Sequence, residues 1–230
     1  MMIQLEFDKD ICAAAPALKV LQIEADVVCC DTSDALWREI EECYAHIHDT
    51  LPMAEVRLRP AIDATRAAYK VCGKDPNRYR PSAEALCRRA VRGLELYRTL
   101  SVIDLINLLS MLTGHSIGGF DAEKIVGTTL TLGVGAEGEP YEAIGRGELN
   151  IAGLPVYRDA VGGIGTPTSD NERTKLSFDT RRLLITLNIY GDEPAYGIDA
   201  LEALACRLLT DYAGAKNIET RLYNLADENS

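Results

Sequence analysis

The spacing of hydrophobic positions changes near residue 120 of this 230-residue chain. Before that point apolar residues recur every three or four positions, which is typical of amphipathic helices. After it they form short runs separated by glycine, which is typical of strands. We predict helices over residues 31–48, 61–71, 81–97, 101–113 and 198–212. We predict strands over residues 3–7, 18–28, 125–135, 141–145, 148–165, 181–191 and 218–225.

Several predicted helix ends have a local chemical reason. Pro81 suits the first turn of a helix, where its missing N–H costs nothing. Ser101 is a plausible N-cap, and Asp104 stands three residues later, where a capping-box acid belongs. Gly114 suits the left-handed position that ends a helix.

These elements predict an α+β fold with a mixed or mainly antiparallel sheet and helices packed on it. Of the residues, 47% are hydrophobic and 26% are charged, which is ordinary globular composition. We expect residues 1–60 to form a small N-terminal α/β cap and residues 61–230 to form the main domain. The alternative is one continuous domain.

Composition also bears on location and cofactors. No stretch approaches the roughly 18 apolar residues that span a bilayer, and the first residues show no basic region followed by an apolar one. We therefore expect a cytoplasmic protein that does not enter a membrane, with reduced cysteines. Cys43, His46 and His48 are the one metal-like cluster, and we interpret them as a solvated helix end. We expect no metal and no cofactor.

The net charge of −11 opposes nonspecific binding of phosphates, but the charge is unevenly distributed. Residues 1–60 carry a net charge of −7, whereas residues 74–98 carry +4. Five of the six arginines in the basic segment lie within residues 78–92: Arg78, Arg80, Arg88, Arg89 and Arg92. Arginine favours forked contacts with phosphate, so a polyanion would bind there. The alternative is a solvated helix face that pairs with Glu84 and Glu95.

The helix over residues 101–113 is apolar nearly all round, which predicts burial. Asp104, Asn107 and Ser110 recur every three residues along it. A buried amide costs free energy unless it has a partner. Asn107 therefore either bonds a neighbouring backbone group or lines a ligand pocket.

The loop over residues 162–174 combines glycines, hydroxyls and acids. Such a loop could present backbone N–H groups to an oxyanion or a phosphate, or it could be an ordinary glycine turn. It is not a Walker loop, because no Gly-Lys-Ser/Thr follows. The three histidines offer no Ser/His/Asp set, and His115 is the one that we expect near a site.

Residues 97–127, YRTLSVIDLINLLSMLTGHSIGGFDAEKIVG, resemble a segment of the B3/4 editing domain of phenylalanyl-tRNA synthetase beta subunits. The family's ordered motif residues correspond here to Asp104, Asn107, Phe120, Asp121, Lys124 and Ile125. Residues 79–90 and 165–174 resemble free-standing members of the family. The likeness extends over about residues 60–225. Gly118 stands where the family has a histidine, and Asn188 aligns near the glutamate that recognises the wrong amino acid.

The resemblance implies an editing module that hydrolyses the ester between a tRNA and a wrongly attached amino acid, here without the synthetase. We expect four positions in the catalytic part of the site: Asn107, Gly118, Gly163 and Gly165. We expect six that bind substrate: Asp104, His115, Thr166, Ser169, Asp170 and Asn188. We expect four that bind RNA: Arg80, Arg88, Arg89 and Arg173.

The partner that this reading implies is an aminoacyl-tRNA, and no oligomeric state is predicted. Loss of the family histidine and the acidic net charge favour an alternative, a module that binds an amino acid, a nucleoside or tRNA without catalysis. A third reading is a structural protein with a vestigial pocket.

Overall fold

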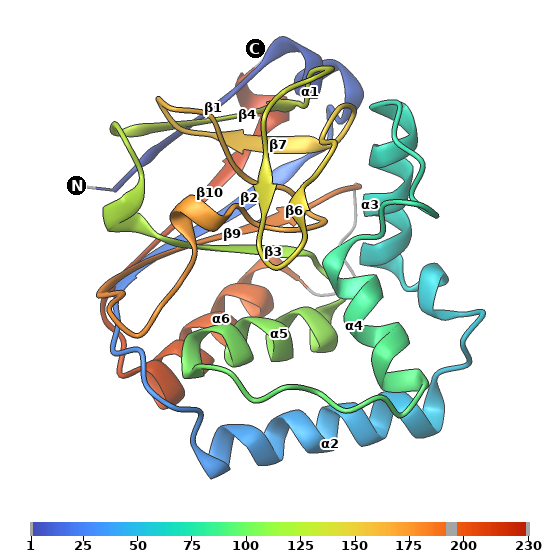
Figure 1. Cartoon of the computed structure of the whole chain (residues 1–230), viewed down its shortest axis with the longest axis vertical. Coiled ribbons are helices and arrows are strands. Elements are labelled where there is room, and N and C mark those ends of the chain that lie inside the picture. Colours follow the sequence, from blue (N-terminus) through green and yellow to red (C-terminus); the bar gives the residue numbers. More distant parts are fainter. Residues whose placement is uncertain (1, 192–196, 229–230) are drawn as a thin grey trace.

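Two strands form the buried centre of the molecule. They are β2 (Lys19–Asp26) and β9 (Arg182–Ile189), and almost every residue of both is buried. Because successive side chains of a strand point to opposite faces, both faces of these strands are covered. β2 and β9 pair with each other, and β10 (Lys216–Asn224) and β3 (Ile117–Asp121) flank them in a fully antiparallel sheet ordered β10-β2-β9-β3. The computed structural model describes residues 2–191 and 197–228 (Figure 1).

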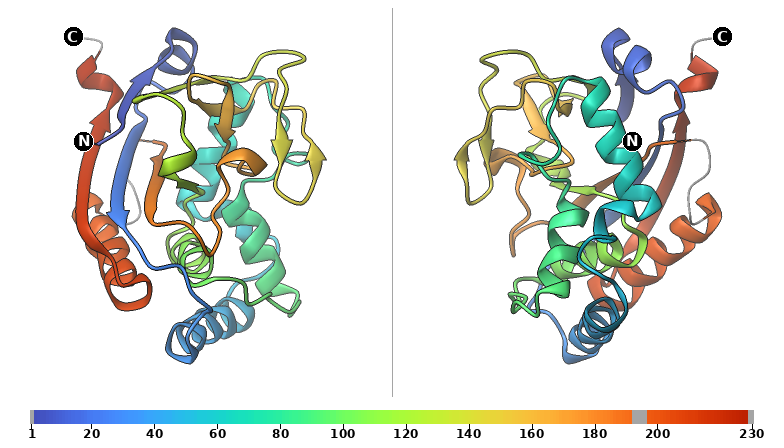
Figure 2. Two further views of the ribbon diagram at one scale, coloured as in Figure 1. Left: turned by 60° about the vertical axis from the view of Figure 1, so that its left-hand side comes forward. Right: turned by 90° about the vertical axis from the view of Figure 1, so that its right-hand side faces the viewer.

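Helices cover one face of this sheet. α5 (Ser101–Thr113) and α6 (Ile198–Ala213) pack on each other, and their apolar residues share one core cluster with β2 and β9. α2 (Asp34–Thr50) and α4 (Ser82–Val91) pack against α5. Figures 1 and 2 show α2 as the outermost of these helices. α5 is therefore enclosed by sheet and helices, which explains why it is apolar nearly all round.

A second sheet lies on the other side of the first. Its order is β1-β4-β7-β8, with β1 (Gln4–Phe7) parallel to β4 (Thr129–Val134), and β7 (Pro155–Arg158) and β8 (Gly163–Gly165) added antiparallel. Phe120 of β3 joins the apolar cluster between the two sheets. A short hairpin of β5 (Glu142–Ala143) and β6 (Gly147–Glu148) projects beside this sheet.

The first sixty residues contribute to both sheets, because β1 pairs with β4 and β2 pairs with β9 and β10. The remaining helices are α1 (Lys9–Ala14), α3 (Pro60–Val71) and α7 (Leu225–Glu228). The division at residue 60 stays a prediction, since strand pairing does not test whether either part folds alone. None of the helices in residues 2–191 and 197–228 has the length and apolar character that crossing a bilayer demands.

The α+β class with a largely antiparallel sheet is confirmed, and Gly114 ends α5 with a φ of 81° as predicted. Several details were wrong. The strand predicted over residues 148–165 is interrupted, with only Pro155–Arg158 and Gly163–Gly165 forming strands after Glu148. α4 ends at Val91 rather than near residue 97, because Gly93 adopts a φ of 63°. Leu100, not Ser101, is the N-cap of α5. Strand β3 and helix α1 were not predicted at all.

Candidate functional site

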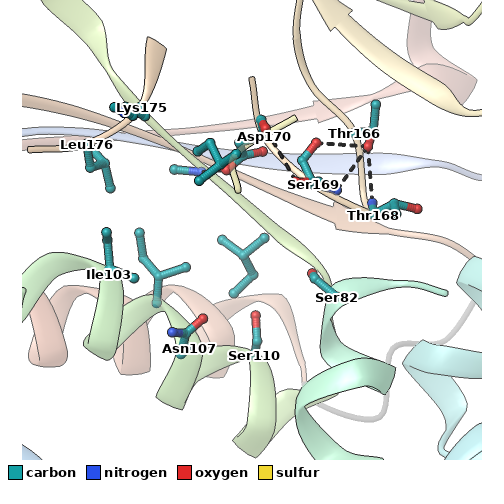
Figure 3. Close-up of a pocket in the computed structure, with 14 residues that line it drawn as sticks. Ser82, Ile103, Asn107, Ser110, Thr166, Thr168, Ser169, Asp170, Lys175 and Leu176 are labelled. Atoms are coloured by element: carbon teal, nitrogen blue, oxygen red, sulfur yellow. Dashed lines mark hydrogen bonds between the residues drawn. The ribbon is translucent and has the colours of Figure 1, made fainter. Parts of the chain in front are cut away.

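A cavity of about 280 Å³ lies between α5 and the segment that follows β8. α5 contributes Ile103, Ile106, Asn107 and Ser110 to its wall, and the facing segment contributes Thr166, Thr168, Ser169, Asp170, Lys175 and Leu176. Figure 3 shows the two sets of side chains opposite each other. These two parts of the cavity wall are about sixty residues apart in the sequence.

Asn107 occupies the central position in this arrangement. Its side chain is half-buried, and no group in residues 2–191 or 197–228 forms a hydrogen bond with it. The amide has two N–H donors and one acceptor oxygen available. It therefore does not bond a neighbouring backbone group, and it faces the cavity.

The turn after β8 is stabilised by its own hydroxyl group. Thr166 Oγ1 accepts from the N–H groups of Thr168 (3.2 Å) and Ser169 (3.1 Å) and donates to the carbonyl of Ser169 (3.0 Å). Ser82 N, at the start of α4, donates to the carbonyl of Pro167 at 2.8 Å. These contacts fix the turn beside α4, and they engage two N–H groups that an oxyanion would otherwise use.

Asp170 is the only acidic residue in the cavity wall among the described residues. Its Oδ2 accepts from Gly119 N at 3.1 Å. Burial raises the pKa of this carboxyl from 3.8 to about 7, and the single N–H donor lowers it only in part. The other charged residue of the wall is Lys175, whose ammonium lies 2.5 Å from Glu172.

The glycines of β3 alternate between two environments. A Cβ on Gly119 would lie 2.6 Å from Ile106 Cδ1, on the cavity side. A Cβ on Gly118 would lie 2.7 Å from Phe120 Cζ and 2.8 Å from Thr186 Oγ1, on the side of the second sheet. Gly118 therefore does not face the cavity, although we placed it in the catalytic part of the site.

Gly163 and Gly165 also permit close packing instead of lining the cavity. A Cβ on Gly165 would lie 2.4 Å from Phe120 Cζ, and one on Gly163 would lie 2.9 Å from Tyr141 Cδ2. These glycines let β8 approach aromatic rings that a larger residue would displace. Close packing against these rings therefore explains why both positions are glycine.

Three other predicted site residues lie in the interior, away from the cavity. Asp104 accepts from Thr32 Oγ1 (2.5 Å), Thr99 Oγ1 (2.6 Å) and Thr99 N (2.9 Å), and so anchors the start of α5. Asn188 accepts from the hydroxyl of Tyr157. His115 Nδ1 lies 3.1 Å from the carbonyl of Asn188, and burial lowers the pKa of His115 to about 4, so the ring is neutral at pH 7.

A second hollow, of about 460 Å³, adjoins the cavity and is lined mainly by arginine. We call it the arginine groove, and its arginines are Arg78, Arg80, Arg88, Arg89, Arg92 and Arg146. Ser82, Asn107 and Thr168 line both the groove and the cavity. The two hollows therefore adjoin at these three residues, one of which is Asn107.

Some of these arginines already have partners. Arg88 forms an ion pair at 2.7 Å with the buried Glu84, which also pairs with Arg66. Arg89 donates to the carbonyl of Glu95 and lies 4.9 Å from the ring centre of Tyr97.

The other four arginines, Arg78, Arg80, Arg92 and Arg146, make no ion pair within the described ranges, so their charge is available to an anion. Arg173 lies elsewhere. It forms a two-pronged pair with Asp159 at 2.7 and 2.8 Å, so its guanidinium is already neutralised.

No group of three or more His, Cys, Asp or Glu side chains among residues 2–191 and 197–228 is arranged to hold a metal ion. Of the cluster that we had considered, Cys43 is buried and His48 Nδ1 lies 3.3 Å from the carbonyl of Ala90.

Sequence reasoning missed Ser82, Gly119, Thr168, Lys175 and Arg146 as members of the site. Arg146 lies in the hairpin of β5 and β6, far along the chain from the arginines of α4. A single sequence gives no signal that would join these two segments. Gly119 was missed because strand β3, which sets the face on which each of its residues lies, was not predicted.

Fold and site together define an α+β protein with a small cavity that adjoins an arginine-lined groove. The model of the B3/4 domain family matches residues 64–194, and the chain belongs to this family. Among solved structures, the chain is similar to an N-terminal fragment of the phenylalanyl-tRNA synthetase beta-subunit from Pyrococcus horikoshii, with 14% identity and a TM-score of 0.46. That similarity covers 94% of this chain and 50% of the Pyrococcus horikoshii fragment, so this chain spans about half of the fragment's length. A search among curated proteins found no match.

Proposed function

We propose that this protein is a free-standing trans-editing hydrolase, which removes a wrongly attached amino acid from tRNA. The observation that carries the proposal is that Asn107 lines both the cavity and the adjoining arginine groove. The charged end of a tRNA has three connected parts: phosphates, a ribose ester and an amino acid. A basic groove, an amide at the junction and a partly apolar cavity match these parts in the same order.

The phosphates are assigned to the groove. Arginine binds phosphate oxygens with two parallel N–H donors, and four arginines of the groove have no ion-pair partner within the described residues. Binding there is compatible with the net charge of −11, because phosphates respond to local charge within roughly 10 Å at 0.1 M salt. Membership of the B3/4 domain family supports the same partner, through the resemblance described above.

The ester is assigned to Asn107. Water attacks the carbonyl carbon and gives up a proton, and the carbonyl oxygen becomes an oxyanion. The carbon–oxygen bond to the ribose then breaks as the ribose oxygen takes up a proton and leaves as a hydroxyl group. The Asn107 amide can donate a hydrogen bond to that oxyanion, and one such donor is worth roughly 10²–10³ in rate. No covalent nucleophile is required if the site holds water and ester in line, and the neighbouring ribose hydroxyl can assist.

The second candidate is a module that binds the aminoacyl end without hydrolysing it. Two observations favour it. Gly118 occupies the position of the family histidine and faces away from the cavity. The N–H groups of Thr168 and Ser169 are engaged by Thr166 and do not point to a ligand. Under this candidate the cavity would bind an amino acid or a nucleoside without turnover.

The test is deacylation of a panel of correctly and incorrectly charged tRNAs by the purified protein. Asn107→Asp is the informative variant, because it keeps the shape of the side chain and replaces its donor by an acceptor. Ser110→Ala, one turn further along α5 in the same wall, is the matched control. Loss of one mischarged species that depends on Asn107 would support hydrolysis. Stable charging across the panel, from folded protein that binds the tRNA, would favour the binding module.

A further inference from the structure

We propose that Asp170 is the receptor for the α-ammonium group of the aminoacyl ester, so that the site accepts free aminoacyl groups with aliphatic side chains and rejects N-acylated ones. This inference rests on the proposed function and names its substrate class. It would exclude peptidyl and formylated esters from the cavity while it admits simple aminoacyl esters.

The Asp170 carboxylate is isolated from cationic side chains. Oδ2 accepts from Gly119 N, and Oδ1 has no donor among the described residues. No cationic side chain contributes to the pKa of Asp170. The cavity's own cation, Lys175, is exposed and already paired with Glu172. A carboxylate set into a cavity wall without a cation therefore lacks the partner that would offset its desolvation.

A bound ligand can supply the cationic partner that Asp170 lacks. A carboxylate in such a setting favours a cation with several donors, and an ammonium group has three. The α-ammonium is the one cation that all unacylated aminoacyl esters share. Acylation turns it into a neutral amide with one donor and adds bulk at the same atom. Asp170 can therefore separate the two classes by charge.

The cavity also favours an aliphatic side chain on the aminoacyl group. Five aliphatic residues line the cavity around the polar groups: Ile103, Ile106, Ile117, Ile144 and Leu176. Burying hydrocarbon against such a surface is favourable. An anionic side chain would meet the same surface and the Asp170 carboxylate, and so would be repelled.

The probe is the trinucleotide CCA whose terminal 3′-hydroxyl is replaced by an amino group that carries leucine as an amide. This amide does not hydrolyse, so it reports binding alone. Dissociation constants are measured for the leucyl probe, its N-acetyl derivative and the aspartyl probe, with wild-type protein and Asp170→Asn. Asparagine keeps an acceptor for Gly119 N and matches the shape of aspartate, so the variant should fold.

We expect wild type to bind the leucyl probe about tenfold or more tightly than the N-acetyl or aspartyl probe. Asp170→Asn should bind the leucyl probe about tenfold more weakly and lose the discrimination against N-acetylation. Equal binding of the leucyl and N-acetyl probes by wild type, no binding of either, or unchanged discrimination in the variant would overturn the inference.

The outcome is separable from that of the proposed function. If the wild-type protein discriminates between the probes but leaves every charged tRNA intact, the result supports the Asp170 assignment and contradicts the proposed hydrolase activity. If the wild-type protein deacylates a charged tRNA and its N-acetylated form at equal rates, the result supports the hydrolase activity and contradicts the role of Asp170 as the receptor for the α-ammonium group.

Discussion

Replacing Asp170 by asparagine should change how the stability of this protein depends on pH. Burial raises the pKa of Asp170 from 3.8 to about 7 in the folded protein. A proton is then bound more tightly by the folded state than by the unfolded state. The stabilisation from this proton is fully present below about pH 4 and is lost as the pH rises through 7. Wild type should therefore lose stability between pH 5 and pH 8, relative to Asp170→Asn.

The magnitude follows from the same pKa. One pKa unit corresponds to about 1.4 kcal/mol, and about two units of the shift fall between pH 5 and pH 8, giving about 2.7 kcal/mol without screening. The side chain is only partly buried in the cavity wall, so solvent screens the charge. We expect the free energy of unfolding of wild type to fall by about 1–2 kcal/mol more than that of Asp170→Asn.

The assay is urea unfolding of both proteins at pH 5 and pH 8. All other titrating groups are common to the two proteins, so they cancel in the difference. Asp159→Asn is the matched control. Burial works to raise the pKa of Asp159, but Arg173 and three backbone N–H groups together hold it below its usual value. That variant should lose a similar amount at both pH values. Parallel pH profiles for wild type and Asp170→Asn would refute the reasoning.

Two further predictions concern the groove and the family histidine. Arg80, Arg92 and Arg146 make no ion pair within the described ranges, so charge reversal at all three should weaken tRNA binding about tenfold or more at 0.1 M salt and flatten its salt dependence, as measured by filter binding. Arg173→Ala should leave the affinity unchanged. The reverse pattern would show that tRNA binds near Arg173 and not in the arginine groove. Gly118→His should cost about 1–3 kcal/mol of stability by thermal unfolding, since its Cβ would meet Phe120 and Thr186, and an equally stable variant would show that β3 can move.

The sequence predicted those elements whose signals are local. β2 and β9 are rich in aliphatic residues, and α5 is a periodic helix followed by a glycine that ends it, so each follows from its own residues. β3 could not be predicted this way, because its Gly118–Gly119 pair has little strand propensity and pairing with β9 imposes its conformation. The left-handed Gly93 that shortens α4 lies inside a pattern that otherwise suits a helix.

The candidate site was predictable to a similar extent. Asn107 was identified because an amide inside an apolar helix needs a reason. Asp104, on the same helix, gave the same signal, but it anchors the start of α5, and only the partners Thr32 and Thr99 distinguish the two. From the sequence Arg173 was predicted to bind RNA, whereas in the structure its guanidinium pairs with Asp159. These outcomes depend on tertiary partners, which a single sequence does not supply.

The most direct test of the central claim is a single-turnover measurement, with enzyme in excess over the mischarged tRNA that the panel identifies. The account predicts that Asn107→Asp lowers the deacylation rate constant by roughly 10²-fold or more while tRNA affinity and thermal stability stay near those of wild type. An unchanged rate constant in the folded variant would contradict the account, because the amide at the junction of cavity and groove would then have no part in the reaction.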